Sequence, residues 1–117
     1  MITLILPEYK AISWNQLYAG RHWSVRSSMA QDAHFQVRCA VIDAGLSMVD
    51  VPVGIEIVAN LRRLLDPDNI CSKIIIDGLK GLVIPDDSSR HVLWVKTRCV
   101  KSVTNFTNIH IYHEQVA

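Results

Sequence analysis

Four aspartates in two short clusters are the residues whose type and spacing suggest chemistry. Asp66 and Asp68 stand two residues apart, and Asp86 and Asp87 follow further along the chain. In an extended segment, residues two apart share one face at about 6.6 Å between Cα atoms, and Pro67 favours that conformation at Asp66. Two carboxylates at this separation can bind one hard cation or two adjacent ones. Oxygen ligands suit Mg²⁺ or Mn²⁺, so the spacing predicts a metal site.

The same segments have a purely structural interpretation. Asp66-Pro67-Asp68-Asn69 is typical of a turn in which Asp68 or Asn69 caps a following helix. Asp86-Asp87-Ser88-Ser89 has the composition of a solvated turn. From the residues alone, both interpretations stay open.

The charge distribution favours a phosphate-containing substrate. The chain has twelve Lys and Arg against eleven Asp and Glu, a net charge of +1. If Asp66, Asp68, Asp77, Asp86 and Asp87 serve a metal site, twelve positive charges face six negative ones elsewhere. A basic surface around an acidic site is what a metal-dependent enzyme acting on phosphates needs. Eight of the twelve cations follow residue 60: Arg62, Arg63, Lys73, Lys80, Arg90, Lys96, Arg98 and Lys101.

An early segment mixes aromatic and basic residues in the way that nucleic-acid-binding loops do. Packing of Tyr18 and Trp23 against the edge of a sheet is an equally good explanation of its aromatic residues. The segment contains Tyr18, Arg21, His22, Trp23 and Arg26.

The elements that must position these residues can be read from periodicity and turn composition. At 117 residues the chain is expected to form one domain, residues 1–117. The order β-α-β-α-β-β predicts an α/β (α+β) fold with one mixed sheet covered by two helices. The second helix, about 22 Å long, separates the two aspartate clusters, which meet only if the chain folds back after it. We expect a strand at 2–6, a loop at 8–23, a helix at 24–44 closed by Gly45, a strand with one buried face at 53–61, a helix at 69–83, and paired strands at 91–101 and 105–113.

The cysteines and the lengths of the apolar runs indicate the cellular compartment of the protein. Cys39, Cys71 and Cys99 are odd in number and far apart, which favours a reducing cytoplasm over a disulfide framework. No apolar run approaches the roughly 20 residues of a membrane span, and residues 1–8 lack the features of a signal peptide. We therefore expect a cytoplasmic protein with no membrane partner.

Three motifs together resemble the RusA family of Holliday junction resolvases, in a bacterial or prophage form. The resemblance is most specific over residues 62–92, and its first motif there is Arg62-Arg63-Leu64-Leu65-Asp66-Pro67-Asp68-Asn69. It is followed by Lys73, by Asp77-Gly78-Leu79 and by Val83-Ile84-Pro85-Asp86-Asp87. The third is Ser13-Trp14-Asn15-Gln16-Leu17-Tyr18 with His22-Trp23-Ser24, which resembles the family's early loop containing an asparagine. The resemblance spans nearly the whole chain.

The resemblance implies a function in DNA recombination and repair. It implies a homodimeric crossover junction endodeoxyribonuclease that cuts four-way DNA junctions with Mg²⁺, for which Mn²⁺ can substitute at oxygen ligands. It also implies that Asp66, Asp68 and Asp87 bind the metal and that Lys73 completes the catalytic set. The spacing from Asp68 to Lys73 is one residue longer than in the family's bacterial prototype, which puts the role of Lys73 in question.

Supporting roles go to further polar residues. Asp86, Asp77 and Asn69 are expected to support the catalytic set, with Asp77 orienting Lys73 from the next helical turn. Two other functions remain open: a DNA-binding protein without catalysis, whose aspartates are caps and turns, and a less specific metal-dependent nuclease of branched DNA. Contacts to DNA are expected from Asn15, Arg21, Arg26, Arg62, Arg63, Lys80 and Arg90.

Overall fold

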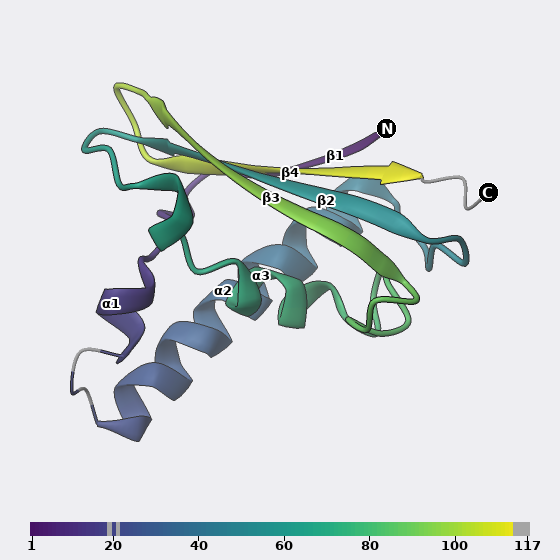
Figure 1. The fold of residues 1–117 in the computed structure, drawn as a ribbon, viewed down its shortest axis with the longest axis horizontal. Helices are drawn as coiled ribbons and strands as arrows, with labels where there is room; N and C mark the ends of the chain where they lie inside the picture. Colours follow the sequence, from purple (N-terminus) through teal and green to yellow (C-terminus); the bar gives the residue numbers. More distant parts are fainter. Residues whose placement is uncertain (19, 21, 114–117) are drawn as a thin grey trace.

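A computed structural model describes residues 1–113 of the chain except 19 and 21, and its sheet and helices follow the predicted order with one addition (Figure 1). The added element is a short helix inside the segment predicted as a loop. The elements are β1 (Ile2–Leu6), α1 (Trp14–Tyr18), α2 (Trp23–Ala44), β2 (Val53–Leu61), a 3₁₀ turn η1 (Pro67–Asn69), α3 (Ser72–Leu79), β3 (Val92–Lys101) and β4 (Phe106–His113).

The four strands form one mixed sheet in the order β1-β4-β2-β3. β4 lies antiparallel to β1 and β2, whereas β2 and β3 run parallel. The prediction that the last two strands pair with each other is therefore wrong, because β2 lies between them. Parallel neighbours need a crossover connection, and α3 supplies it between β2 and β3. The link from β3 to β4 then passes the end of β2, where the Ser102 N–H donates to the Leu61 carbonyl at 2.9 Å.

The helices cover one face of the sheet (Figure 1). Val37 of α2 and Ile75 and Leu79 of α3 are buried in one cluster with Ile57 of β2 and Ile109 of β4. α2 ends as predicted at Gly45, which has a positive φ of 65°. Its N–H and that of Leu46 close the last turn on Ile42 and Val41, the usual way a glycine ends a helix.

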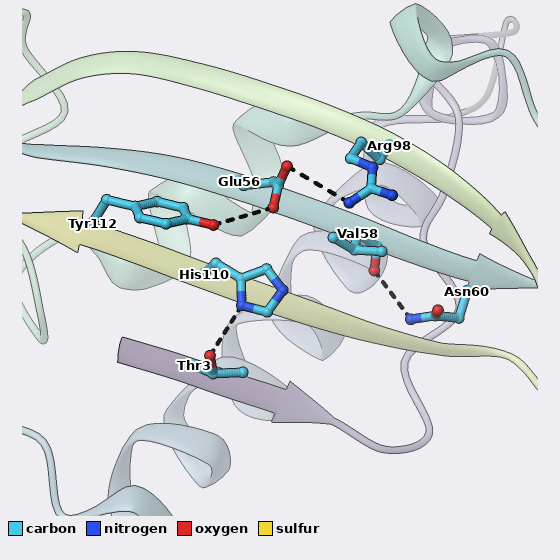
Figure 2. A network of polar contacts seen from close by, with 7 residues as sticks. All are labelled: Thr3, Glu56, Val58, Asn60, Arg98, His110 and Tyr112. Atoms are coloured by element: carbon cyan, nitrogen blue, oxygen red, sulfur yellow. Dashed lines mark hydrogen bonds and ion pairs between the residues drawn. The ribbon is translucent and has the colours of Figure 1, made fainter. Parts of the chain in front are cut away.

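The opposite face of the sheet carries a network of polar contacts (Figure 2). The Arg98 guanidinium lies 4.0 Å from the Glu56 carboxylate, and the Tyr112 hydroxyl contacts the same carboxylate at 3.5 Å. Thr3 and His110 share a hydrogen bond of 3.0 Å. Large side chains cover this face so well that β2 is buried almost throughout. A Cβ at Gly54 would stand 1.9 Å from the Trp94 ring, so the prediction of only one buried face for this strand is wrong.

Both helices next to the aspartates differ from the prediction. The predicted loop at 8–23 contains α1, whose N-terminus is closed by a reciprocal pair of bonds between Ser13 and Gln16. The predicted helix at 69–83 is only α3, Ser72–Leu79. It begins late because Ile70 bridges to Ser13 and the Cys71 N–H donates to the Ile12 carbonyl at 2.9 Å. None of the helices in the described part of the chain has the length and apolar character needed to cross a membrane.

Candidate functional site

The first aspartate pair lies on a tight turn that begins five residues after the end of β2. Asp66 is extended, with φ −67° and ψ 136°, but Pro67 starts a 3₁₀ turn that contains Asp68. The prediction that both aspartates share one face of an extended segment is therefore wrong. Proline has the φ angle of a first helical position, so here it begins a turn instead of prolonging the strand. The Thr97 hydroxyl of β3 donates to the Pro67 carbonyl at 2.6 Å and anchors the turn to the sheet.

Neither carboxylate of this pair is used as a helix cap. Asp66 makes no side-chain bond to the 3₁₀ turn, and the N-cap of α3 is Cys71, which also has no side-chain cap bond. Asn69 uses its backbone N–H, which donates to the Asp66 carbonyl at 2.9 Å. Among the residues that the structure describes, neither Asp66 nor Asp68 forms an ion pair, and both are exposed. The turn interpretation is confirmed and the capping interpretation is not, which leaves two carboxylates open to a ligand.

Lys73 and Asp77 face each other across one turn of α3. The Lys73 ammonium lies 3.4 Å from the Asp77 carboxylate, and the lysine side chain remains 60 % exposed. Such a surface pair adds little to stability, but it limits the positions that the ammonium can occupy. Lys73 lies in the first turn of α3, where free backbone N–H groups also favour an anion.

The early aromatic and basic segment lies next to Lys73. A pocket of about 250 Å³ is lined by Tyr18, Arg26, Lys73 and Asp77, together with Ser27 and three apolar side chains. The Arg26 guanidinium lies 6.0 Å from the centre of the Tyr18 ring, within the range of a cation–π contact. Tyr18 is therefore exposed beside a cation and is not packed on the sheet edge. Asn15 is exposed on α1, and Arg21 lies outside the described residues.

The second aspartate pair makes its own contacts. The Asp86 carboxylate accepts a hydrogen bond of 2.8 Å from the Asp87 N–H. That bond, together with the Asp87 side chain, lowers the pKa of Asp86 below its usual value. The Asp87 carboxylate lies 3.8 Å from the Lys80 ammonium. Asp86 therefore stabilises a turn, while Asp87 has a cationic partner.

The structure does not bring the two aspartate pairs together. Asp66 and Asp68 precede the N-terminus of α3, whereas Asp87 contacts Lys80 at its C-terminal cap. The eight residues of α3 extend about 12 Å, and in Figure 1 the η1 turn and the loop after α3 lie at opposite ends of this helix. Within the described ranges, no three His, Cys, Asp or Glu side chains are grouped closely enough to bind a metal ion.

The remaining predicted contacts lie on the surface around these groups. Arg62 and Arg63 are exposed directly after β2, and Lys80 and Arg90 are exposed on either side of the second aspartate pair. The sequence analysis missed the Ser13–Gln16 capping pair, although serine followed by glutamine three residues later is a known signal for a helix start. It also missed Lys10 and Lys101, which join Arg62 and Arg63 in one pocket.

Comparison with known proteins adds no further evidence. The sequence matches no protein-family model, and no curated protein matches it.

Proposed function

We propose that this protein is a Mg²⁺-dependent endonuclease that resolves four-way DNA junctions in the cytoplasm. The observation that carries the proposal is the exposed Asp66–Asp68 turn, which is fixed to β3 through Pro67 and has no cationic partner among the described residues. Both carboxylates are exposed and carry like charge. An opposite charge close by favours the ionised form of a carboxylate, so a bound cation would suit this turn.

The chemistry of the turn fits Mg²⁺, with Mn²⁺ as a substitute. Mg²⁺ typically keeps several waters and is bound by one or two carboxylates together with substrate phosphates, so Asp66 and Asp68 are a sufficient protein contribution. When bound, the metal would supply Lewis-acid polarisation of the scissile phosphate.

Lys73 would bind and stabilise the reacting phosphate. Its ammonium would donate to a non-bridging oxygen and offset the negative charge that develops there. Asp77 would hold that ammonium in position through the contact of 3.4 Å. Asn69, whose N–H is already bonded to Asp66, would keep the turn in shape.

Asp87 would be the third ligand only after a local rearrangement. Its ion pair with Lys80 has to open, and the turn after α3 has to move toward the N-terminus of that helix. A DNA phosphate bound to Lys80 would favour the opening, because it competes with Asp87 for the same ammonium. Asp86 would remain the residue that shapes the turn.

The predicted contact residues, six cations and the Asn15 amide, would bind the phosphate backbone of the junction arms. Such contacts position a protein on DNA without reading its sequence. We assign them to Asn15, Arg21, Arg26, Arg62, Arg63, Lys80 and Arg90.

A homodimer follows from the symmetry of the substrate. Resolution requires two cuts related by an approximate two-fold axis, and one chain carries one Asp66–Asp68 turn. A C₂ dimer supplies two sites in the required relation and is the commonest closed assembly. Light scattering at micromolar concentration should give about twice the chain mass of 13.2 kDa. A monomer that still makes paired, symmetric cuts would contradict the dimer.

A second candidate is a DNA-binding protein without catalysis. The pairing of Asp87 with Lys80 favours it, because Asp87, the third metal ligand that the resemblance implies, already has a cationic partner. A less specific metal-dependent nuclease of branched DNA would be intermediate between the junction-resolving enzyme and the non-catalytic protein.

One assay separates these functions. Purified protein is incubated with synthetic four-way junctions, flaps and linear duplexes, each in Mg²⁺ and in EDTA, beside Asp68→Asn purified in the same way. The proposal predicts paired symmetric nicks in the junction with Mg²⁺ only and with the wild type only. Equal cutting of flaps would indicate the less specific nuclease, and binding without products would indicate the non-catalytic protein.

A further inference from the structure

A basic pocket lies at the end of the sheet where β2 and β3 finish. It encloses about 460 Å³ and is lined by Lys10, Arg62, Arg63, Lys101 and Asn105. A second hollow shares Lys10, Arg62 and Asn105 with it and also includes Glu8. Four of the five side chains that line the pocket carry a positive charge. The pocket therefore has the composition of an anion-binding site.

Hydrogen bonds from distant parts of the chain hold the pocket in place. The Arg62 N–H donates to the Asn105 side-chain oxygen at 2.9 Å, and the Lys101 ammonium donates to the Arg62 carbonyl. On the other side, the Thr107 hydroxyl donates to the carbonyl of buried Tyr9 at 2.9 Å and fixes the backbone just before Lys10. The cations are thus brought together by the fold, although Lys10 and Lys101 are far apart in the sequence.

The charges of this pocket are not neutralised by the part of the protein that the structure describes. All four cationic side chains are exposed, and the ion pairs of the described residues involve Lys73, Lys80 and Arg98 instead. Of the described residues, Glu8 in the adjoining hollow is the one acidic residue that lines either space. Four like charges held at one place repel each other, and an anionic ligand would relieve that repulsion.

The lining indicates which anion would bind. Arginine matches the geometry of phosphate oxygens with paired N–H donors, and lysine adds a point charge. Among the residues that the structure describes, no aromatic side chain lines this pocket, so it offers no surface on which a base could stack. The chemistry suits a phosphodiester backbone better than a nucleotide recognised by its base.

The pocket lies within reach of a DNA strand bound at the Asp66–Asp68 turn. Thr97 contacts Pro67, and Lys101 follows four residues later on the same strand, about 13 Å away along β3. That distance corresponds to about four nucleotides along the axis of a duplex. A single arm could therefore contact both places.

We propose that the Lys10–Arg62–Arg63–Lys101 pocket binds the phosphodiester backbone of one DNA strand at a position away from the cut. The ligand class rests on the proposed function, whereas the pocket itself rests on the contacts above. Binding there is independent of base sequence and sensitive to salt.

The test compares two double variants with the same change in charge. Lys10→Ala/Arg63→Ala removes two pocket cations, and the control Arg38→Ala/Lys96→Ala removes two exposed cations elsewhere. Binding of a fluorescent four-way junction is measured by anisotropy in EDTA at several salt concentrations between about 50 and 200 mM, the range over which phosphate contacts lose most of their affinity. Thermal melting checks that both variants are folded, and Arg63→Gln alone serves as a milder variant.

The pocket variant should bind more weakly by about tenfold or more, equally for unrelated sequences, with a log K against log salt slope smaller by about 2. The control should keep the wild-type slope. Equal slopes for both double variants would overturn the pocket while leaving Mg²⁺-dependent cleavage by the wild type intact. If the pocket variant has the smaller salt slope but the wild type cleaves no DNA, only the proposed nuclease function would be overturned. A wild type that binds no DNA would overturn both the pocket and the nuclease function.

Discussion

The two aspartate pairs on either side of α3 have the same chemical groups and opposite surroundings. Asp86 accepts the Asp87 N–H at 2.8 Å, and Asp87 lies 3.8 Å from Lys80. Asp66 and Asp68 have neither kind of contact within the described residues, although their turn is anchored to β3 through Pro67. The type of a residue alone therefore does not identify a ligand site. The partners already present decide which carboxylates remain available.

The largest effect on cleavage should come from removing one negative charge from the Asp66–Asp68 turn. Asp66→Asn or Asp68→Asn keeps the shape of the side chain but should lower Mg²⁺-dependent junction cleavage by more than about a hundredfold, the upper loss for residues that only support a metal ligand. Junction binding in EDTA should be unchanged or tighter, because a charge opposing DNA is gone. Single-turnover cleavage and anisotropy measure the two quantities. Wild-type cleavage rates in either variant would refute the metal assignment.

A smaller loss is expected for Lys73→Ala. Removal of one group that stabilises transition-state charge should lower kcat by about a hundredfold, the lower end of the range for such groups, while substrate affinity should change little. Asp77→Asn, which breaks only the contact of 3.4 Å, should lower kcat less than Lys73→Ala. If Lys73→Ala raises KM and leaves kcat unchanged, the lysine serves binding alone.

The two residues of the second aspartate pair, Asp86 and Asp87, should respond unequally to substitution. Asp87→Asn should reduce cleavage by about tenfold, as expected for a weak or transient ligand, whereas Asp86→Asn should cleave normally because an amide oxygen can still accept the Asp87 N–H. An inactive Asp86→Asn beside a normally active Asp87→Asn would reverse the assignment of the two residues.

Acid should remove what Asp86 contributes to stability. Its pKa is lowered in the folded protein by the Asp87 N–H, so its contribution is present above the unfolded pKa and is lost as pH falls through the lowered folded value. Asp86→Ala should therefore have a slightly lower melting temperature than the wild type near neutral pH. This is the smallest of the expected effects. The two melting curves should converge in acid, and a gap that widens there would contradict the hydrogen bond.

Local patterns in the sequence predicted most of the helices and strands but not how these elements pair and pack. The helix closed by Gly45 and the strand at 53–61 follow from apolar spacing and a turn residue, and the structure confirms both. The pairing of β3 with β2 instead of β4 could not be read in this way, because neighbouring strands are chosen by tertiary packing. The late start of α3 likewise depends on the bridge from Ile70 to Ser13, a contact between distant segments.

The candidate site was predictable only in part for the same reason. Residue types pointed to Asp66 and Asp68, but the preference of the residue before a proline for extended geometry did not reveal that Pro67 would start a 3₁₀ turn. The partner of Asp87 could not be inferred, since Lys80 reaches it only after the turn at Gly81, where φ is 81°. Spacing along the chain also gave no reason to place Lys10 beside Lys101.

The most direct test of the central claim is where a divalent cation binds. Mn²⁺ titrated into isotope-labelled protein broadens the amide signals of residues close to the bound ion. Selective broadening at residues 66–69, lost in Asp66→Asn/Asp68→Asn and kept in Asp86→Asn/Asp87→Asn, is the predicted result. Broadening confined to residues 86–88, or no selective broadening in the wild type, would contradict the conclusion that the unpaired turn is the metal site.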